Sequence, residues 1–383
     1  MKIKDFKINV SQSEIDALNL KIDSTRWPDE VNDKHWTMGT SKEFLESALD
    51  YWRTDFSWSK HESKINEVGS YIFKSNTGLD IHFLHSKSKD SNAIPIIMTH
   101  GWPGSVQEFL KIIPVLNKGI NGICFDVICP SMPGYGFSSK PKKNGINSKE
   151  IAKINHELMH ELGYKKYVAQ GGDWGATVSK WTADLFKEHC IGLHLNMILA
   201  FPPEGDDPYE GVSEEEKEGM QNFQKYQEKG SGYFAIQSTK PQTVAYGLTD
   251  SPAGLAGWII EKFHAWTNDN ENKLVIPLEE VLAIISLYWY SNSIASSMRL
   301  YYENGQAGFS FDYVEQPTGC ALFDKEIVLP PRVWVEKIYN VKQWDKFSGG
   351  HFAALENPKN LAASIVNFCE SAQIKDCLLY TSD

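Results

Sequence analysis

A glycine-flanked aspartate stands where a short apolar run gives way to a helical pattern. The segment is QGGDWGA, residues 170–176, directly after the apolar residues 167–169. A strand that bends sharply into a helix needs small residues two before and two after the bend, and Gly171 and Gly175 supply them. A carboxylate on such a bend, Asp173, is a candidate covalent nucleophile. The alternative is that Asp173 only caps the helix, which aspartate does well.

A second candidate segment is HGWPGS, residues 100–105, which follows the apolar run 94–98 and precedes another helical pattern. A loop at this place can offer a backbone N–H to an oxyanion, together with the N–H of the residue after the nucleophile. These groups are the N–H of Trp102 and the N–H of Trp174. Because Gly and Pro mark turns of every kind, the segment could also be only a tight turn.

A late histidine, His351 in GGHF, is the candidate base. A lone histidine is more commonly a surface or core residue, but the chain order nucleophile, acid, histidine supports a catalytic role. Two carboxylates compete for the acid role, Asp324 and Glu326 in LFDKEI. The local pattern does not say which of them points into the site, so both stay open.

The elements that must position these residues alternate along the chain from near residue 65. Residues 71–74 and 79–85 flank the turn-rich Asn-Thr-Gly trio and predict an antiparallel hairpin. Further short apolar runs, separated by helical patterns, predict a mostly parallel sheet of eight strands with helices on both faces. These runs are residues 94–98, 125–129, 167–169, 193–198, 319–323 and 341–347.

The same patterns divide the chain into four parts. Strand-like runs disappear between residues 201 and 308, where polar helical segments predict a helical cap. Residues 61–200 and 309–372 then form the core that carries the sheet. Residues 1–60 hold four tryptophans in polar sequence and predict a segment that wraps around the main domain. Residues 373–383 are a tail to which no role is assigned.

Composition restricts the partners. The 383 residues have a net charge of −11 with no basic stripe, which argues against nucleic acid. The six cysteines lack the paired spacing of a zinc site or a disulfide framework, which favours a reducing, cytoplasmic setting. No apolar stretch approaches about 18 residues, so we expect no membrane anchor. A homo-oligomer stays open.

Taken together, five motifs resemble the microsomal-type epoxide hydrolase family, including the juvenile-hormone-type enzymes. They are HGWPGS, GGDWG, DSPAGLAGWIIEKFHAW, SSMRLYYEN and GGHFAALENP. The likeness runs from the Trp27-Pro28 region to about Phe368, although HGxP and GxDxG alone are shared with dehalogenases. The resemblance implies the α/β-hydrolase fold, no metal or organic cofactor, and a small apolar epoxide and water as partners. Some members begin with a membrane-spanning anchor; this sequence has none, which implies a soluble form.

The resemblance also implies roles for individual residues. The family's nucleophile falls on Asp173, its histidine on His351 and its acid on Glu326, which favours Glu326 over Asp324.

The family's two cap tyrosines fall on Tyr233 and Tyr301, with Tyr302 as the adjacent alternative. The implied reaction is attack of Asp173 on a ring carbon while the tyrosines activate the epoxide oxygen. A water activated by His351 then hydrolyses the ester to release a vicinal diol. Aromatic cap residues hint at an apolar substrate, and we expect several of them to be core residues: Phe234, Trp258, Phe263, Trp266 and Tyr288.

Three other functions use some of the same residues or the same fold. A haloalkane dehalogenase would use the same aspartate, histidine and acid but does not need a pair of phenols. A non-catalytic ligand-binding protein of this fold has no reason to keep nucleophile, acid and base together. A serine-type esterase is disfavoured because no serine occupies position 173.

Overall fold

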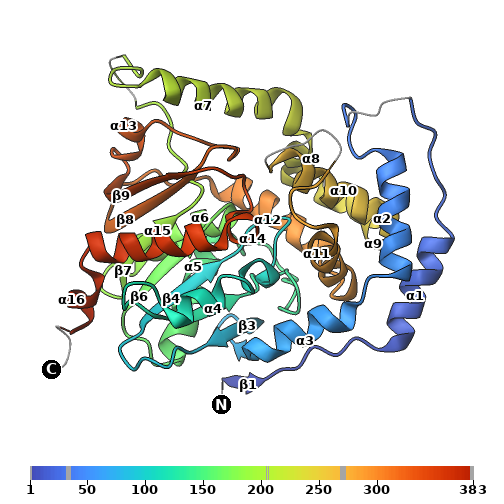
Figure 1. The fold of residues 1–383 in the computed structure, drawn as a ribbon, viewed down its shortest axis with the longest axis horizontal. Coiled ribbons are helices and arrows are strands. Elements are labelled where there is room, and N and C mark those ends of the chain that lie inside the picture. Colours follow the sequence, from blue (N-terminus) through green and yellow to red (C-terminus); the bar gives the residue numbers. More distant parts are fainter. Residues whose placement is uncertain (1, 32–35, 204, 206, 268–272, 380–383) are drawn as a thin grey trace.

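The computed structural model describes every residue except 1, 32–35, 204, 206, 268–272 and 380–383. One nine-stranded sheet runs through the molecule in the order β1-β2-β3-β5-β4-β6-β7-β8-β9 (Figure 1). The pairs from β1 to β5 are antiparallel and the pairs from β5 to β9 are parallel. The strands are β1 (Ile3–Asp5), β2 (Ser70–Lys74), β3 (Asp80–Ser86), β4 (Ile94–Thr99), β5 (Phe125–Pro130), β6 (Tyr167–Gly171), β7 (Cys190–Leu195), β8 (Val314–Phe323) and β9 (Tyr339–Phe347).

The sheet has one strand more than the eight expected. The eight predicted runs correspond to β2 through β9, and the additional strand is β1, which pairs with β2 at the antiparallel edge. Its three residues, Ile3–Asp5, are too few to show an alternating pattern in the sequence. The antiparallel hairpin of β2 and β3 is where the Asn-Thr-Gly turn placed it.

Helices cover both faces of the sheet because its central strands are apolar on both sides. In β4, Ile96 and Met98 pack in one hydrophobic cluster with α4 and α15, and Ile97 packs in another with α5 and α6. The helices of this layer arrangement are η1 (Val106–Phe109), α4 (Ile113–Lys118), α5 (Ser148–Glu161), α6 (Trp174–Leu185), α13 (Arg332–Val335), α14 (Ala353–Glu356), α15 (Pro358–Ser371) and α16 (Ile374–Leu379).

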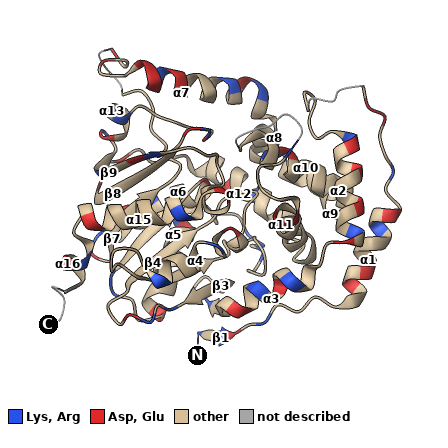
Figure 2. Ribbon diagram, in the orientation of Figure 1, with Lys and Arg blue, Asp and Glu red and all other residues tan. Residues whose placement is uncertain are grey.

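Between β7 and β8 the described residues form helices and no strand, and we name these elements the cap helices. They are α7 (Glu214–Lys225), the π-helical turn η2 (Tyr226–Gly230), α8 (Gly232–Thr239), α9 (Pro241–Asp250), α10 (Pro252–Ala265), α11 (Leu278–Tyr290) and α12 (Ile294–Ala307). In α7 acidic residues fill the first turn and Lys225 the last, which complements the helix dipole (Figure 2).

The N-terminal segment joins the cap helices to the sheet. It contains α1 (Gln12–Asp23), α2 (Lys42–Thr54) and α3 (Trp58–Val68). Helices α1 and α2 pack against α10, and α3 contacts both α11 and the β2–β3 hairpin (Figure 1). The buried Trp52 donates its indole N–H to the hydroxyl of Ser286 in α11 at 2.9 Å. Of the four tryptophans, Trp52 and Trp58 are buried.

The C-terminal segment begins as a packed helix. Ile374, at the start of α16, is fully buried and belongs to the same hydrophobic cluster as Ile96 of β4 and residues of α15. Residues 380–383 of the expected tail lie outside the described residues. Within the described chain, no helix is long and apolar enough to span a bilayer.

Candidate active site

Asp173 occupies a strained bend between β6 and α6. Its backbone has φ 50° and ψ −131°, a conformation that side chains larger than glycine rarely adopt. A Cβ on Gly175 would overlap the carbonyl oxygen of Thr99, and one on Gly171 would overlap the carbonyl oxygen of Gly175. Within the described chain the Asp173 side chain makes no capping hydrogen bond to α6, so helix capping does not account for it.

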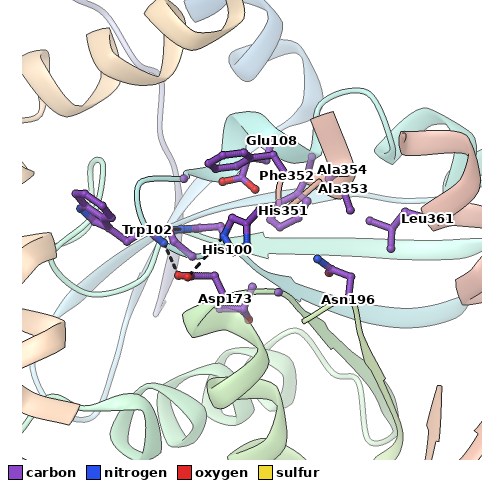
Figure 3. Close-up of a pocket in the computed structure, with 15 residues that line it drawn as sticks. His100, Trp102, Glu108, Asp173, Asn196, His351, Phe352, Ala353, Ala354 and Leu361 are labelled. Carbon is purple, nitrogen blue, oxygen red and sulfur yellow. Dashed lines mark hydrogen bonds and ion pairs between the residues drawn. The ribbon is translucent and has the colours of Figure 1, made fainter. Parts of the chain in front are cut away.

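The loop after β4 holds one oxygen of this carboxylate. The backbone N–H of Trp102 donates to Oδ1 of Asp173 at 2.7 Å (Figure 3). Burial raises the pKa of Asp173, while His351 and the backbone N–H groups of Trp102 and Trp174 oppose that rise. The loop is also a turn, since the N–H of Gly104 donates to the carbonyl of Gly101. The segment is therefore a turn whose Trp102 N–H donates to the Asp173 carboxylate, and its binding of an oxyanion stays a prediction.

The His351 ring lies between two carboxylates. Its Nδ1 is 2.6 Å from Oε1 of Glu326. Its Nε2 is 3.6 Å from Oδ2 of Asp173, and Figure 3 shows this pair. Burial alone would lower the pKa of His351, but Glu326, then Asp173 and Glu108, outweigh it and raise the pKa to about 9. The two carboxylates thus favour the imidazolium form of His351, in which both ring nitrogens are protonated and Nε2 pairs with Asp173.

The turn after β8 separates the two competing acids. Glu326 is buried, and its Oε1 also accepts the N–H of Ile327 at 2.7 Å. Asp324 is exposed and accepts the N–H of Gly349 at 2.9 Å, which supports the loop that carries His351. Glu326 is thus the carboxylate beside the imidazole, and the exposed Asp324 stabilises the loop that carries His351 through its hydrogen bond with Gly349.

Two cap helices bring phenols to the carboxylate. Tyr233 in α8 and Tyr301 in α12 are both buried, with ring centroids 5.9 Å apart. Tyr233 stacks on Trp102 at 5.3 Å, and Tyr301 meets Trp174 edge-on at 4.8 Å. Burial raises the pKa of both phenols well above the usual range, so each holds its proton.

Both tyrosines line one large cavity with Asp173. The cavity has a volume of about 470 Å³, a size that fits a small organic ligand, and Tyr302 is not among its lining residues within the described chain. Besides Asp173 and the tyrosines its walls are mostly apolar, with Trp174, Met197, Leu199, Phe223, Phe234 and Phe309 among them.

Of the five aromatic cap residues expected to shape a substrate site, Phe234 lines this cavity. The other four pack in the hydrophobic cluster around it: Trp258, Phe263, Trp266 and Tyr288. These four agree with the expectation that several of the five are core residues; the sequence did not say which, because an aromatic residue in a helix gives the same pattern whether it faces a cavity or a neighbouring helix.

Asp173 also lines a second, much smaller cavity, whose described lining residues do not include the two tyrosines. It has a volume of about 20 Å³, and the side chains of Glu108, Asn196 and His351 line it together with Asp173 (Figure 3). Burial raises the pKa of Glu108 to about 8, while the charge of His351 and the N–H of Ser105 oppose the rise.

Sequence reasoning did not single out Glu108, Tyr226 or Lys262, which also surround the site. Ser105 and Glu108 form a capping box in which each side chain accepts the other's backbone N–H. The sequence signal of that box, S-x-x-E, is present as SVQE, but it predicts only the start of a helix. Nothing in the local pattern distinguishes Tyr226 or Lys262 from other polar residues of the cap helices.

Known proteins resemble this chain over nearly its whole length. Residues 3–109 match the family model described as epoxide hydrolase N terminus, and residues 94–238 match the alpha/beta hydrolase fold. Epoxide hydrolase 1 of Sus scrofa is 38% identical over 96% of this chain and 88% of that protein. Juvenile hormone epoxide hydrolase 1 of Ctenocephalides felis is 36% identical over 95% of this chain and 84% of that protein.

The chain belongs to the epoxide hydrolase family. Solved structures agree with this membership and with the α/β-hydrolase fold. The juvenile hormone epoxide hydrolase of Bombyx mori superposes with a TM-score of 0.89 at 31% identity, covering 98% of this chain and 95% of that one. The epoxide hydrolase of Aspergillus niger gives 0.88 at 30% identity, covering 97% of each chain.

Proposed function

We propose that this chain hydrolyses a small apolar epoxide to a vicinal diol through a covalent ester on Asp173. One observation carries the proposal, namely that the Asp173 carboxylate lines two cavities at once. The large cavity contains the Tyr233 and Tyr301 phenols, and the small one contains His351. Two successive reactions on one carboxylate need such a pair of approaches, one for the epoxide and one for water.

In the first step a carboxylate oxygen of Asp173 attacks a ring carbon, and the carbon–oxygen bond of the strained ring breaks. An epoxide has no carbonyl to polarise, so the departing oxygen needs a proton donor, which a phenol can supply. Tyr233 and Tyr301 lie in the same cavity as the carboxylate and are protonated. In this proposal residues 201–308 form a cap that carries the acids, residues 61–200 and 309–372 form the core that carries nucleophile and base, and residues 1–60 wrap around them.

In the second step His351, oriented by Glu326, takes a proton from water, and the oxygen attacks the ester carbonyl of Asp173. The N–H groups of Trp102 and Trp174 hold the resulting oxyanion.

The volume of about 20 Å³ beside His351 suits about one water molecule, and polar atoms of Glu108 and Asn196 are there to bind it. Removing one oxyanion donor costs roughly 10²–10³-fold in rate, so the hydrolysis step depends strongly on this loop geometry. No step in this sequence needs an electron acceptor or a metal Lewis acid.

The phenols distinguish this proposal from its closest chemical alternative. A haloalkane dehalogenase would use the same nucleophile and base, but a halide leaves without a proton. Two buried, protonated phenols beside Asp173 therefore favour an oxygen leaving group.

The proposal is tested by trapping the ester. His351→Gln should open an epoxide once and stall, so that mass spectrometry finds one substrate mass added to the peptide that contains Asp173. Asp173→Ala is the matched blank and should show neither adduct nor diol. Multiple turnovers of the unaltered enzyme in H₂¹⁸O should place label in the Asp173 carboxylate. Recovery of unmodified His351→Gln protein together with unlabelled Asp173 would reject the two-step reaction, and halide release from alkyl halides would favour a dehalogenase.

A further inference from the structure

A buried lysine lies over the ring of one of the two phenols. The ammonium nitrogen of Lys262, near the end of α10, is 4.3 Å from the ring centroid of Tyr233 and 5.7 Å from that of Trp266. The lysine is 6% exposed and forms an ion pair with the neighbouring Glu261. A cation in this position favours negative charge on the ring beneath it, because the charge of a phenolate spreads over the ring.

A third phenol touches the same tyrosine. The hydroxyls of Tyr226 and Tyr233 share a hydrogen bond of 2.9 Å, in which either can donate. Tyr226 stands at the start of the π-helical turn and lines the large cavity with Tyr233. A hydroxyl that donates to a phenolate oxygen stabilises it, since a hydrogen bond to an ion is about twice as strong as one between neutral groups.

Tyr301, the other candidate proton donor, differs from Tyr233 in its neighbours. Among the residues that the structure describes, the Tyr301 hydroxyl meets the geometric criteria for a hydrogen bond with none, and its one polar neighbour of note is the Tyr233 hydroxyl, whose pKa it lowers. No described lysine or arginine lies over its ring either, while Lys262 lies over Tyr233. The two tyrosines that the family resemblance treats as a pair therefore differ in their surroundings.

We infer that Tyr233 is the phenol that gives its proton to the epoxide oxygen, that Lys262 and Tyr226 stabilise the phenolate it leaves, and that Tyr301 only donates a hydrogen bond. This inference rests on the proposed function. Lys262 and Tyr226 act through Tyr233 and are positioning residues, while Tyr233 and Tyr301 contact the substrate oxygen.

The charges balance in this scheme. Before attack the negative charge is on Asp173; after attack Asp173 is a neutral ester, the substrate oxygen is a hydroxyl and the charge is on the Tyr233 oxygen. Ester hydrolysis later releases one proton as Asp173 returns to a carboxylate, and that proton restores the phenol. The opening step thus moves one negative charge from the carboxylate to a place under the Lys262 ammonium.

Burial explains why the phenolate needs this support. Burial raises the pKa of Tyr233 well above the ordinary range; Tyr226, through its charge and its hydrogen bond, and Asp173 raise it further, while a hydrogen bond with Tyr301 lowers it. Tyr226 stabilises the Tyr233 phenolate only when its hydroxyl is the donor of their shared hydrogen bond, which the geometry allows. Attack turns Asp173 into an ester and removes one of these obstacles at the moment when the proton moves. The remaining cost of a buried anion is what Lys262 offsets.

The test replaces the cation and measures the two steps separately. Lys262→Met keeps the side-chain length and removes the charge; Lys240→Met, an exposed lysine of the cap, is the matched control. Single-turnover ester formation with 1,2-epoxyhexane should slow about 10- to 30-fold in Lys262→Met, as expected for loss of a desolvated cation–π contact. Hydrolysis of the ester should keep its rate, and Lys262→Arg should recover most of the lost rate.

A double-mutant cycle separates this role from a structural one. Lys262→Met should cost almost nothing further in a Tyr233→Phe background and its full factor in a Tyr301→Phe background. The loss should also shrink with 1,1,1-trifluoro-2,3-epoxypropane, because its fluorines stabilise the departing oxygen and reduce the need for a proton. Tyr226→Phe, which disturbs packing little, should slow ester formation about 2- to 10-fold with the same dependence on Tyr233.

Distinct results would overturn the inference and the proposed function. If the unaltered enzyme forms no Asp173 ester, the proposed function fails. If the unaltered enzyme forms the ester and both Lys262→Met and Tyr226→Phe form it at the same rate, the inference fails while the proposed function stands. Equal losses in the Tyr233→Phe and Tyr301→Phe backgrounds, or equal losses with both epoxides, also reject it. If Lys262→Met does not fold, the Tyr226→Phe cycle decides by the same criteria.

Discussion

Removing the charge of Asp173 should lower the pKa of His351 from its value of about 9. Oδ2 of Asp173 is 3.6 Å from Nε2 of His351. At an effective dielectric constant of about 20, two unit charges at that separation attract by about 4–5 kcal/mol. This value is an upper limit for the contribution of Asp173 to the raised pKa of His351, because Glu326 contributes more. Even a contribution of about 1 kcal/mol moves the titration midpoint by most of a pH unit.

This charge is also the one that the proposed reaction removes. When Asp173 becomes an ester, the attraction that keeps His351 protonated is lost, and the imidazole becomes available as a base when water must be activated. Asp173→Asn reproduces that loss of charge without substrate. We therefore expect a smaller fraction of His351 to be protonated in the ester form than in the resting enzyme at the same pH.

The assay is a pH titration of histidine ring signals by NMR in Asp173→Asn and in the unaltered enzyme. His351→Gln assigns the signal by its disappearance. Asp324→Asn removes the exposed carboxylate on the neighbouring turn and should leave the His351 midpoint in place. An unchanged or higher midpoint in a folded Asp173→Asn protein would refute the coupling between the two residues and the switch built on it.

Two further predictions concern stability. Gly175→Ala should lower the free energy of unfolding by about 1–3 kcal/mol, because the new methyl group overlaps the carbonyl of Thr99. The control Gly247→Ala, in open space on α9, should be neutral or stabilising. Equal midpoints of urea unfolding for the two variants would contradict the packing argument. Glu108 has its pKa raised from 4.5 to about 8, so its contribution to stability is complete below about pH 4.5 and is lost as pH rises through about 8. Glu108→Gln should therefore flatten the fall in unfolding free energy across that interval, and an unaltered slope in urea titrations would count against a buried, protonated Glu108.

Most of the sheet could be predicted from the sequence because its strands are short apolar runs bounded by turns. Eight of the nine strands correspond to such runs, and the three-residue β1 does not. The bend at Asp173 was predictable for the same local reason, since a tight strand-to-helix turn requires Gly171 and Gly175 within a few residues. The N-terminal segment was predictable in part, because its buried tryptophans mark a packed segment but not the cap helices that it contacts.

Other parts of the site were not predictable because they depend on which side of an element faces inward. Asp324 and Glu326 are two residues apart on one turn, and only the packing of that turn puts the second beside His351. Glu108 and Tyr226 carry no sequence signal of a site, and Lys262 lies in the motif DSPAGLAGWIIEKFHAW without being marked there as a site residue. The three residues come from separate elements.

By itself, the sequence determined the local geometry: the glycine-flanked bend that holds Asp173, the loop that offers the Trp102 N–H, and the order in which nucleophile, acid and histidine follow. Each of these depends on a few neighbouring residues, whose steric and hydrogen-bonding limits are the same in any fold. The tertiary structure alone decided that Asp173 faces two cavities and that Lys262 lies over Tyr233 rather than Tyr301. Those relations join residues far apart in the chain, and the packing of the cap helices on the core sets them.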